Sequence, residues 1–275
     1  MKRFEGILFI SDLDGTLMNS EHKLSAENSM AIEYFKENGG LFTFVTGRMP
    51  CTSASICEAV RPNAPFGCIN GGGIFDHIKN EYLWTLPLSH DVIELVEFAD
   101  NSINDLGIQV NTFENIYFCK ENTQMEIFRR ITGLPNLTAD YKKINEPIAK
   151  ILFGDSDPEV ITHLAKILTE HPKAYMYDFI RSEPNLYEIL PKGSGKGNLI
   201  PKLAEIVGVS MDNTIAVGDY YNDISMLKAA RIGIAVANAC DEAKEAADFV
   251  TVSNDEHAIA QIISDIDSGR IYFDK

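Results

Sequence analysis

The chain has 275 residues, 45% of them hydrophobic, which is enough to bury one large core or two smaller ones. Its 40 acidic and 24 basic residues give a formal charge of −16, and this balance disfavours nonspecific binding to nucleic acid or to anionic membrane surfaces. The five cysteines are scattered and odd in number, so they match neither a disulfide framework nor a zinc site and suit a reducing compartment.

The sequence contains no segment that would direct the chain to a membrane. Lys2 and Arg3 precede an apolar stretch, but this stretch ends at Asp12 and is too short for a secretory segment. No run approaches the roughly 18 apolar residues of a membrane span. We therefore expect a cytoplasmic protein that binds neither membrane nor nucleic acid, and the sequence leaves open whether it is a monomer or a dimer.

The first part of the chain alternates between strand-like and helix-like patterns. Ser25 is a typical helix N-cap, and the helix that it begins should end at the glycines 39–40. Short apolar runs predict buried strands at 7–10, 41–45 and 66–69. The glycines 71–73, which follow the last of these, favour a hairpin or tight turn over a dinucleotide site. Strands and helices in this order indicate a parallel α/β sheet.

The pattern changes at about residue 88 and stays different for about a hundred residues. Helices are expected from Ser89 and from Asp157, which Pro158 follows at the first helical position. Strands with one polar face are expected at 109–119 and 149–153, and further strands are expected at 175–180 and 186–190. The segment 88–190 therefore indicates an inserted α+β domain.

The opening pattern resumes after Gly193. A helix is expected from Lys196 to Val207, although Pro201 should delay its start or bend it. Buried strands are expected at 214–217 and 232–236. The simplest architecture is one Rossmann-like α/β core, built from 1–87 and 191–275, that carries the inserted domain.

Four polar clusters fall at the ends of the expected core elements. They are Asp12 with Asp14, Thr46-Gly47, Lys196 and the run 218–223. Because parallel strands end at one edge of their sheet, the three clusters that follow strands should converge, and a helix N-terminus can bring Lys196 there too. Carboxylates this close need a cation or hydrogen-bond donors, and magnesium prefers carboxylate and phosphate oxygens. This inventory suits metal-assisted phosphoryl transfer.

Each cluster taken alone has an ordinary structural explanation. An Asp-x-Asp pair at a turn is usually a solvated loop, and a lone lysine is usually on the surface. The segment 193–197 looks like a phosphate-binding loop, but Gly197 stands where a Walker motif needs serine or threonine. The six histidines form no ligand pair. It is the joint order of the four clusters that favours a site.

These clusters resemble the four motifs of the haloacid dehalogenase superfamily. Segments similar to its Cof-like phosphatases are 69–71, 191–197, 222–227, 237–239 and 246–248. The resemblance covers nearly the whole chain, and the insert matches the type IIB cap of that branch in length and place. It implies a core that carries out the chemistry and a cap that selects the substrate. The implied activity is magnesium-dependent hydrolysis of small phosphorylated metabolites.

The resemblance also implies roles for particular residues. Asp12 would attack phosphorus to form an aspartyl-phosphate, and Asp14 would be the acid–base partner. The groups that would bind the phosphate are Leu13 through its amide, Thr46, Gly47, Lys196 and Asn222. The groups that would hold Mg²⁺ are Asp12, the Asp14 carbonyl and Asp219. Asp223 would either bind the ion directly or support the residues that do. Arg48 is a candidate for a substrate contact.

Several functions stay open at this level. Sugar phosphates are the leading substrates of the expected phosphatase, with cofactor phosphates second. A hexose phosphomutase would share the core and a similar cap, but it needs a second phosphate site, for which Arg129-Arg130 and Lys142-Lys143 are the candidates. A phosphoaspartate signalling module without turnover also combines an acidic pair with threonine and lysine. Such modules are much shorter than this chain.

Overall fold

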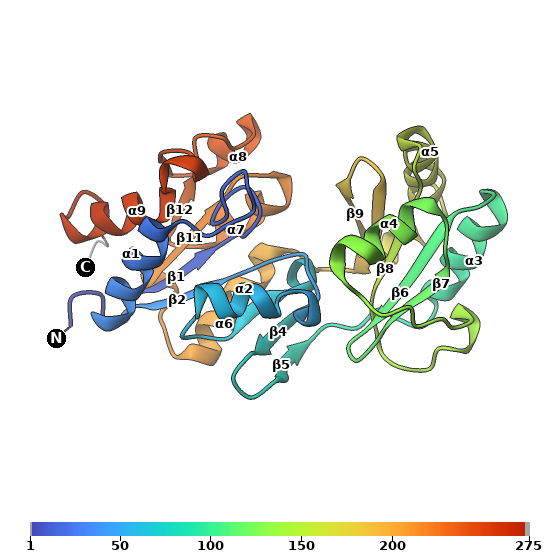
Figure 1. The fold of residues 1–275 in the computed structure, drawn as a ribbon, viewed down its shortest axis with the longest axis horizontal. Helices are drawn as coiled ribbons and strands as arrows, with labels where there is room; N and C mark the ends of the chain where they lie inside the picture. Colours follow the sequence, from blue (N-terminus) through green and yellow to red (C-terminus); the bar gives the residue numbers. More distant parts are fainter. Residues whose placement is uncertain (1, 273–275) are drawn as a thin grey trace. The chain divides into compact units, whose positions relative to one another are not determined.

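The computed structural model describes residues 2–272 and divides into two compact units (Figure 1). The first unit runs to Trp84 and resumes at Gly195, and the second is Thr85–Ser194. The limits expected from the sequence, which are 1–87 and 191–275 for the core and 88–190 for the inserted domain, remain predictions. Within residues 2–272, we find no helix that combines the length and the apolar character required to span a bilayer.

The first unit is built on a five-stranded sheet in which every pair of neighbours is parallel. Its strands, in spatial order, are β13 (Phe249–Val250), β12 (Ile232–Ala235), β11 (Thr214–Gly218), β1 (Leu8–Ser11) and β2 (Leu41–Phe44). Strands β1, β11 and β12 are buried along their whole length, as expected of a parallel sheet that is covered on both faces. The predicted α/β class with a parallel core is confirmed.

Helices cover both faces of this sheet. They are α1 (Ala26–Glu37), α2 (Ala54–Val60), α6 (Lys196–Val207), α7 (Ile224–Ala229), α8 (Asp241–Ala246) and α9 (Ala258–Asp267). Leu199 and Leu203 of α6 pack in one core with Leu8 of β1. Phe9, which points to the other face, contacts Phe35 of α1 with ring centroids 5.8 Å apart. The sheet is thus held between two apolar layers.

Two of these helices test the sequence predictions. The Ser25 hydroxyl accepts from the Asn28 amide, so the predicted N-cap of α1 is confirmed. Helix α6 begins at Lys196 and contains Pro201, so the expectation of a late start is wrong. Pro201 is the sixth of the twelve residues of α6 and is exposed, so the helix loses one backbone hydrogen bond while Leu199 and Leu203 stay packed in the core.

The third predicted strand lies in a different sheet. Strand β3 (Phe66–Cys68) pairs antiparallel with β4 (Gly73–Asp76), which neighbours β5 (Glu81–Thr85). Only the bridge between Val45 and Gly67 joins β3 in parallel to the end of β2. The expectation of a third regular parallel strand was therefore wrong, because the tight turn after β3 sends the chain back beside it. The tight turn itself was predicted.

The second unit contains a five-stranded sheet with antiparallel pairing. Its strands, in spatial order, are β7 (Ile116–Lys120), β6 (Gly107–Thr112), β8 (Ile148–Gly154), β10 (Leu186–Pro191) and β9 (Tyr177–Glu183). The single strand expected at 109–119 is two strands. Their turn contains no glycine or proline and is closed by the Asn115 amide, which donates to the Thr112 hydroxyl at 2.8 Å. The sequence therefore offered no standard turn signal there.

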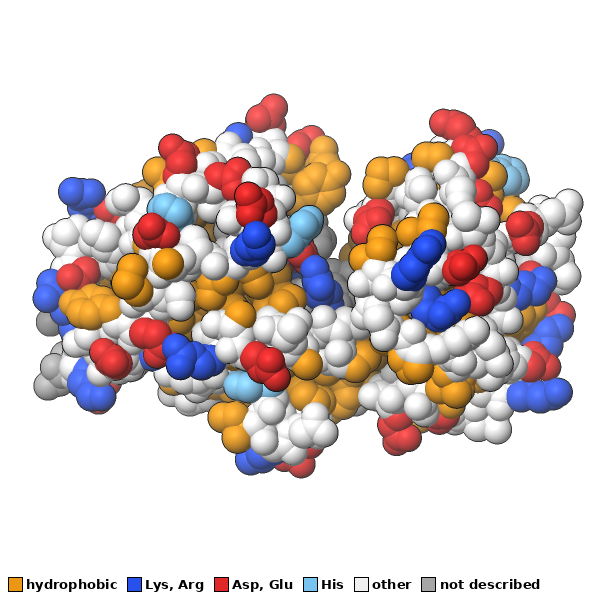
Figure 2. Space-filling model, in the orientation of Figure 1, with side chains coloured by type: hydrophobic (Ala, Val, Ile, Leu, Met, Phe, Trp, Pro, Cys, Tyr) orange, Lys and Arg blue, Asp and Glu red, His pale blue; other side chains and the backbone are white. Residues whose placement is uncertain are grey.

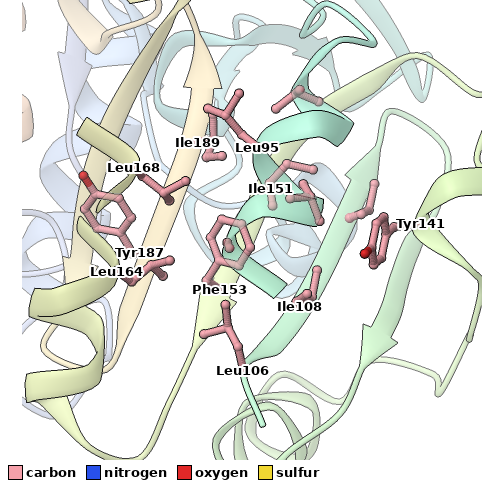
Figure 3. Close-up of a cluster of buried hydrophobic side chains, with 14 of the residues drawn as sticks. Leu95, Leu106, Ile108, Tyr141, Ile151, Phe153, Leu164, Leu168, Tyr187 and Ile189 are labelled. Carbon is pink, nitrogen blue, oxygen red and sulfur yellow. The ribbon is translucent and has the colours of Figure 1, made fainter. Parts of the chain in front are cut away.

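One face of this sheet carries the core of the second unit. Helices α3 (Val92–Ser102) and α5 (Pro158–Thr169) pack on this face, whereas Met125 of α4 (Thr123–Thr132) lies beside Gly107 and Gly154, whose positions alternate with those of the core. Figure 3 shows Leu95 of α3 and Leu164 of α5 gathered around Ile108, Phe153 and other apolar side chains of the sheet. Helix α5 has the Asp157 cap and the proline at its first position that the sequence predicted.

Candidate active site

The acidic turn begins immediately after β1, at the edge where the parallel strands end. Asp12 is the first residue beyond the strand, and its amide donates to the Val217 carbonyl of β11 at 2.8 Å. Lys196 is the first residue of α6, and its Nζ lies 2.5 Å from Asp12 Oδ1 and 2.6 Å from Asp223 Oδ1. Asp12 is 6% exposed and Lys196 is 2% exposed. The predicted lysine thus lies between two of the predicted carboxylates.

These buried charges shift one another's proton affinity. Burial and the negative charge of Asp223 raise the pKa of Asp12 well above its usual range, against the opposing effect of Lys196. Burial alone would lower the pKa of Lys196, but the charges of Asp12 and Asp223 outweigh it, and the pKa is raised. The raised pKa of Lys196 keeps its ammonium charged beside these two carboxylates.

Asp219 adds a third carboxylate just past the end of β11. Its Oδ1 accepts a hydrogen bond of 2.8 Å from the Thr16 hydroxyl. Burial, together with the charge of Asp223, raises the pKa of Asp219 to about 6. A Cβ added to Gly15, which has a φ of +85°, would lie 2.5 Å from Asp219 Oδ2. The turn therefore needs glycine at this position, both for its conformation and for the space that Asp219 occupies.

The three carboxylates can offer a metal ion one oxygen each. One carboxylate oxygen from each residue can be chosen so that all three lie within 4.8 Å of one another; the residues are Asp12, Asp219 and Asp223. They are hard ligands, and Lys196 alone does not balance their three negative charges. This donor set fits a hard divalent cation. The Asp14 carboxylate does not belong to the group found among the described residues.

Asp223 also orders the backbone of this loop. While its Oδ1 accepts from Lys196, its Oδ2 accepts from the amides of Asp219 and Tyr220, at 3.0 and 3.1 Å. Its carboxylate is almost fully enclosed. A Cβ on Gly218 would lie 2.5 Å from the Asp223 side chain, so the strand end also requires glycine. Both oxygens of the Asp223 carboxylate thus accept hydrogen bonds from the protein, which suits a residue that holds the loop in place.

Asp14 lies apart from the buried cluster and pairs with Arg48. The guanidinium donates from Nη2 to Asp14 Oδ1 at 2.7 Å and from Nε to Oδ2 at 3.1 Å. The two side chains are 44% and 40% exposed, so the pair lies at the surface of the site. The contact of Arg48 with the predicted acid–base residue was not anticipated from the sequence.

The predicted phosphate-binding groups lie on neighbouring turns. Thr46 is buried, and its hydroxyl accepts from the Arg48 amide at 3.2 Å, which closes the turn after β2. Leu13 is fully buried, and its carbonyl accepts from the amides of Thr16 and Met18. These contacts give both turns a fixed backbone, as groups that bind an anion through amides and hydroxyls require.

A residue that the sequence prediction left without a role lies between two of these turns. The Asn222 amide group donates to Asn70 Oδ1 at 3.4 Å, and a Cβ added to Gly47 would lie 2.9 Å from the Asn70 carboxamide. Asn70 is 3% exposed. In the sequence, Asn70 belongs to the segment 69–71, which contributes to the family resemblance, and the glycines after it indicated a turn, but neither gave it a role. Its αL conformation is the signal that singles it out, and that is visible only in the structure.

A row of buried polar side chains in the second unit was also missed. These residues come from the sheet positions that alternate with the apolar core and are Gln109, Asn111, Lys150 and Glu188. Lys150 and Glu188 form an ion pair of 2.9 Å. Gln109 Nε2 and Asn111 Oδ1 have no hydrogen-bond partner within residues 2–272. Because buried polar atoms are rarely left unpaired, this row needs an explanation.

The basic residues that a second phosphate site would need are largely neutralised. Figure 2 shows acidic and basic side chains interspersed over the visible face. Arg129 pairs with Glu121, and Lys142 pairs with Glu97. These contacts indicate that Arg129 and Lys142 take part in surface ion pairs, and they do not support the phosphomutase interpretation.

Comparison with known proteins agrees with this geometry. Residues 9–263 match the family model described as haloacid dehalogenase-like hydrolase. The chain is 30% identical to the putative phosphatase YxeH of Bacillus subtilis, over 94% of this chain and 97% of that protein. It is also 30% identical, with the same coverage, to the B. subtilis 5-amino-6-(5-phospho-D-ribitylamino)uracil phosphatase YwtE.

The solved structures agree as well. A haloacid dehalogenase-like hydrolase from Bacteroides thetaiotaomicron superposes with a TM-score of 0.83 at 27% identity, over 95% of this chain and 100% of that chain. The similarity therefore extends through both units of the fold.

Proposed function

Because this chain belongs to the haloacid dehalogenase-like hydrolases, and is a phosphatase of their Cof-like branch, we propose that it hydrolyses small phosphorylated metabolites through an aspartyl-phosphate on Asp12. The observation that carries the proposal is the position of Lys196, buried between Asp12 and Asp223 and beside Asp219. An isolated surface turn with two aspartates would not need such an arrangement. A signalling module without turnover is set aside, because the match to hydrolases runs through nearly the whole chain.

Asp12 is the proposed nucleophile. Lys196 contacts its Oδ1, which orients the carboxylate so that Oδ2 can attack phosphorus. A bond forms between this oxygen and phosphorus while the bond from phosphorus to the leaving oxygen breaks. Water then attacks the phosphorus of the aspartyl-phosphate, which releases inorganic phosphate and restores the Asp12 carboxylate.

Asp14 is the proposed proton carrier in both steps. It would give a proton to the leaving oxygen in the first step and take one from the attacking water in the second. Its exposed position suits a residue that must reach the leaving group. Arg48 holds both oxygens of this carboxylate, so the pair must open before Asp14 can act.

The remaining groups would hold the phosphate and the cation. We propose that the phosphoryl oxygens are bound by Lys196, Asn222, the Thr46 hydroxyl and the amides of Leu13 and Gly47. Mg²⁺ would be held by Asp12, Asp219 and the Asp14 carbonyl, with Asp223 supporting them. When bound, Mg²⁺ supplies positive charge that neutralises the phosphoryl oxygens and the excess of carboxylates.

We propose sugar phosphates as the substrate class, with cofactor phosphates second, and the second unit as the part that selects among them. YwtE acts on a phosphate ester of a ribityl chain, which is a polyol, and it shares 30% of its residues with this chain. Gln109 Nε2 is an unpartnered donor and Asn111 Oδ1 an unpartnered acceptor, and a hydroxyl group can pair with either. They therefore support the choice of a hydroxyl-rich leaving group.

The test is release of inorganic phosphate from a panel of sugar, polyol, nucleotide and cofactor phosphates, with and without Mg²⁺. Asp12→Asn is the blank, because it keeps the shape of the side chain and removes the nucleophile. We expect hydrolysis that requires Mg²⁺ and is lost in this variant. Equal turnover of a generic aryl phosphate by Asp12→Asn and the wild type would refute the mechanism. Isomerisation of a hexose phosphate without phosphate release would favour a mutase.

A further inference from the structure

The turn between β3 and β4 contains two successive residues in a left-handed conformation. Ile69 has a φ of 57° and Asn70 a φ of 49°. This region is uncommon for residues other than glycine and is unfavourable above all for a β-branched residue such as isoleucine. Each such residue costs on the order of 1–3 kcal/mol, and strain of this kind is kept only where the surroundings impose it.

Contacts on both sides impose this conformation. The amides of Ile69 and Asn70 donate to the carbonyls of Arg48 and Thr46, at 3.0 and 3.1 Å. On the other side, a Cβ added to Gly71 would lie 2.4 Å from the Gly195 carbonyl oxygen. The strained turn is therefore fixed between the turn after β2 and the residue that precedes Lys196.

The conformation places one carboxamide against two proposed phosphate-binding groups. The Asn70 side chain occupies the space beside Gly47, where a Cβ would come within 2.9 Å of its nitrogen and its oxygen. Its Oδ1 also accepts from the Asn222 Nδ2 at 3.4 Å. Asn70 is buried, so this side chain is enclosed among groups of the site and is not available to solvent.

We propose that Asn70 is a positioning residue for the phosphate-binding turns, an inference that rests on the proposed function. Its carboxamide supports the Gly47 peptide and holds the Asn222 side chain, so that both keep the orientation needed to donate to phosphoryl oxygens. Donors that are oriented in advance need no reorganisation when the phosphate binds. The contacts on both sides hold the left-handed backbone, and in this conformation the side chain lies between the two turns.

Asparagine also tolerates the left-handed region better than most residues, so the test must separate conformation from the carboxamide. Asn70→Gly does this, because glycine adopts the same backbone without strain and removes the side chain. The matched control is Asn80→Gly, since Asn80 is also a left-handed asparagine (φ 57°) in the first unit but is exposed in the turn between β4 and β5.

The readouts are kcat, KM and the binding of orthophosphate, measured by calorimetry in the presence of Mg²⁺. We expect Asn70→Gly to weaken orthophosphate binding about tenfold and to lower kcat/KM by about 10- to 100-fold, since misplaced binding groups cost that much. Asn80→Gly should leave both unchanged. Asn222→Ala should add little to Asn70→Gly, because both changes disturb one unit. Wild-type values for Asn70→Gly, or full additivity with Asn222→Ala, would overturn the proposal.

Two further comparisons separate a folding defect, and a failure of the proposed function, from a failure of the role proposed for Asn70. If Asn70→Gly does not fold, Asn70→Asp replaces it; this variant keeps the left-handed backbone but adds a negative charge, so it should bind orthophosphate at least tenfold more weakly. Wild-type binding by Asn70→Asp would also overturn the inference. If the wild type hydrolyses nothing yet binds orthophosphate more tightly than Asn70→Gly, the proposed function fails and the role of Asn70 stands.

Discussion

Replacing Lys196 by methionine should destabilise the first unit more than any surface lysine change. The substitution keeps the apolar stem and leaves Asp12 and Asp223, whose oxygens lie 2.5 and 2.6 Å from the ammonium, without a counter-charge. At an effective dielectric constant of about 20, Coulomb's law gives about 6.5 kcal/mol for each pair at these distances. The desolvation cost of the buried ammonium offsets part of that loss. Breaking a buried pair in this way costs about 3–5 kcal/mol.

The measurement is urea unfolding followed by the fluorescence of Trp84, the only tryptophan of the chain, which lies in the first unit. With a slope near 2 kcal/mol/M, the midpoint should fall by about 2 M. Lys202→Met is the control, because Lys202 lies on the same helix and pairs with Glu205 in an exposed ion pair worth at most about 1 kcal/mol. Adding Asp12→Asn to Lys196→Met should restore part of the stability. If the two lysine variants unfold at the same midpoint, the charge argument is wrong.

Four other predictions follow from contacts described above. Mg²⁺ at 100 times its Kd should stabilise the wild type by about 2.7 kcal/mol in thermal unfolding, and Asp219→Asn should remove most of that gain. Gly15→Ala should weaken the same Mg²⁺ effect and lower stability by about 1–3 kcal/mol in urea, since its Cβ would lie 2.5 Å from Asp219 Oδ2. Hydrogen bonds from Thr112 and Tyr117 lower the pKa of Glu146 in the folded protein. The ionised Glu146 therefore stabilises the fold fully above the pKa that it has in the unfolded chain, and this contribution is lost as the pH falls through the folded pKa. Glu146→Gln should accordingly flatten the acid side of a plot of unfolding free energy against pH. Gln109→Leu should raise stability by up to about 1 kcal/mol and lower kcat/KM for polyol phosphates more than for an aryl phosphate, which steady-state kinetics on both substrates would check.

The sequence predicted the core of the site because that part depends on local pattern. Apolar runs that end in Asp12, in Thr46 and in Asp219 identify strands and the edge at which they stop. Parallel pairing then brings these residues together, whatever the details of the helices. The helix that begins at Lys196 could be predicted in the same way, and Pro201 did not prevent it.

The rest depends on contacts between distant segments. The role proposed for Asn70 follows from backbone angles that Arg48, Thr46 and Gly195 impose, and no local pattern records them. The ion pair between Arg48 and Asp14 could likewise not be predicted, because the sequence does not show which acidic residue Arg48 contacts. In the second unit, a polar face was predicted for the strand that contains Gln109 and Asn111, but the burial of these two side chains was not.

The order of pairing in the first sheet has a consequence for the synthesis of the chain. Strand β1 is made before the second unit, yet Leu8 pairs with Thr214, which is made after that unit. The second unit, Thr85–Ser194, is continuous and can complete its strand pairing before the first can. Because contacts between distant residues form slowly, we expect the inserted unit to fold while β1 still lacks one of its partners. Asp12 is thus made before the insert, and Lys196, which contacts it, is made only after the whole insert.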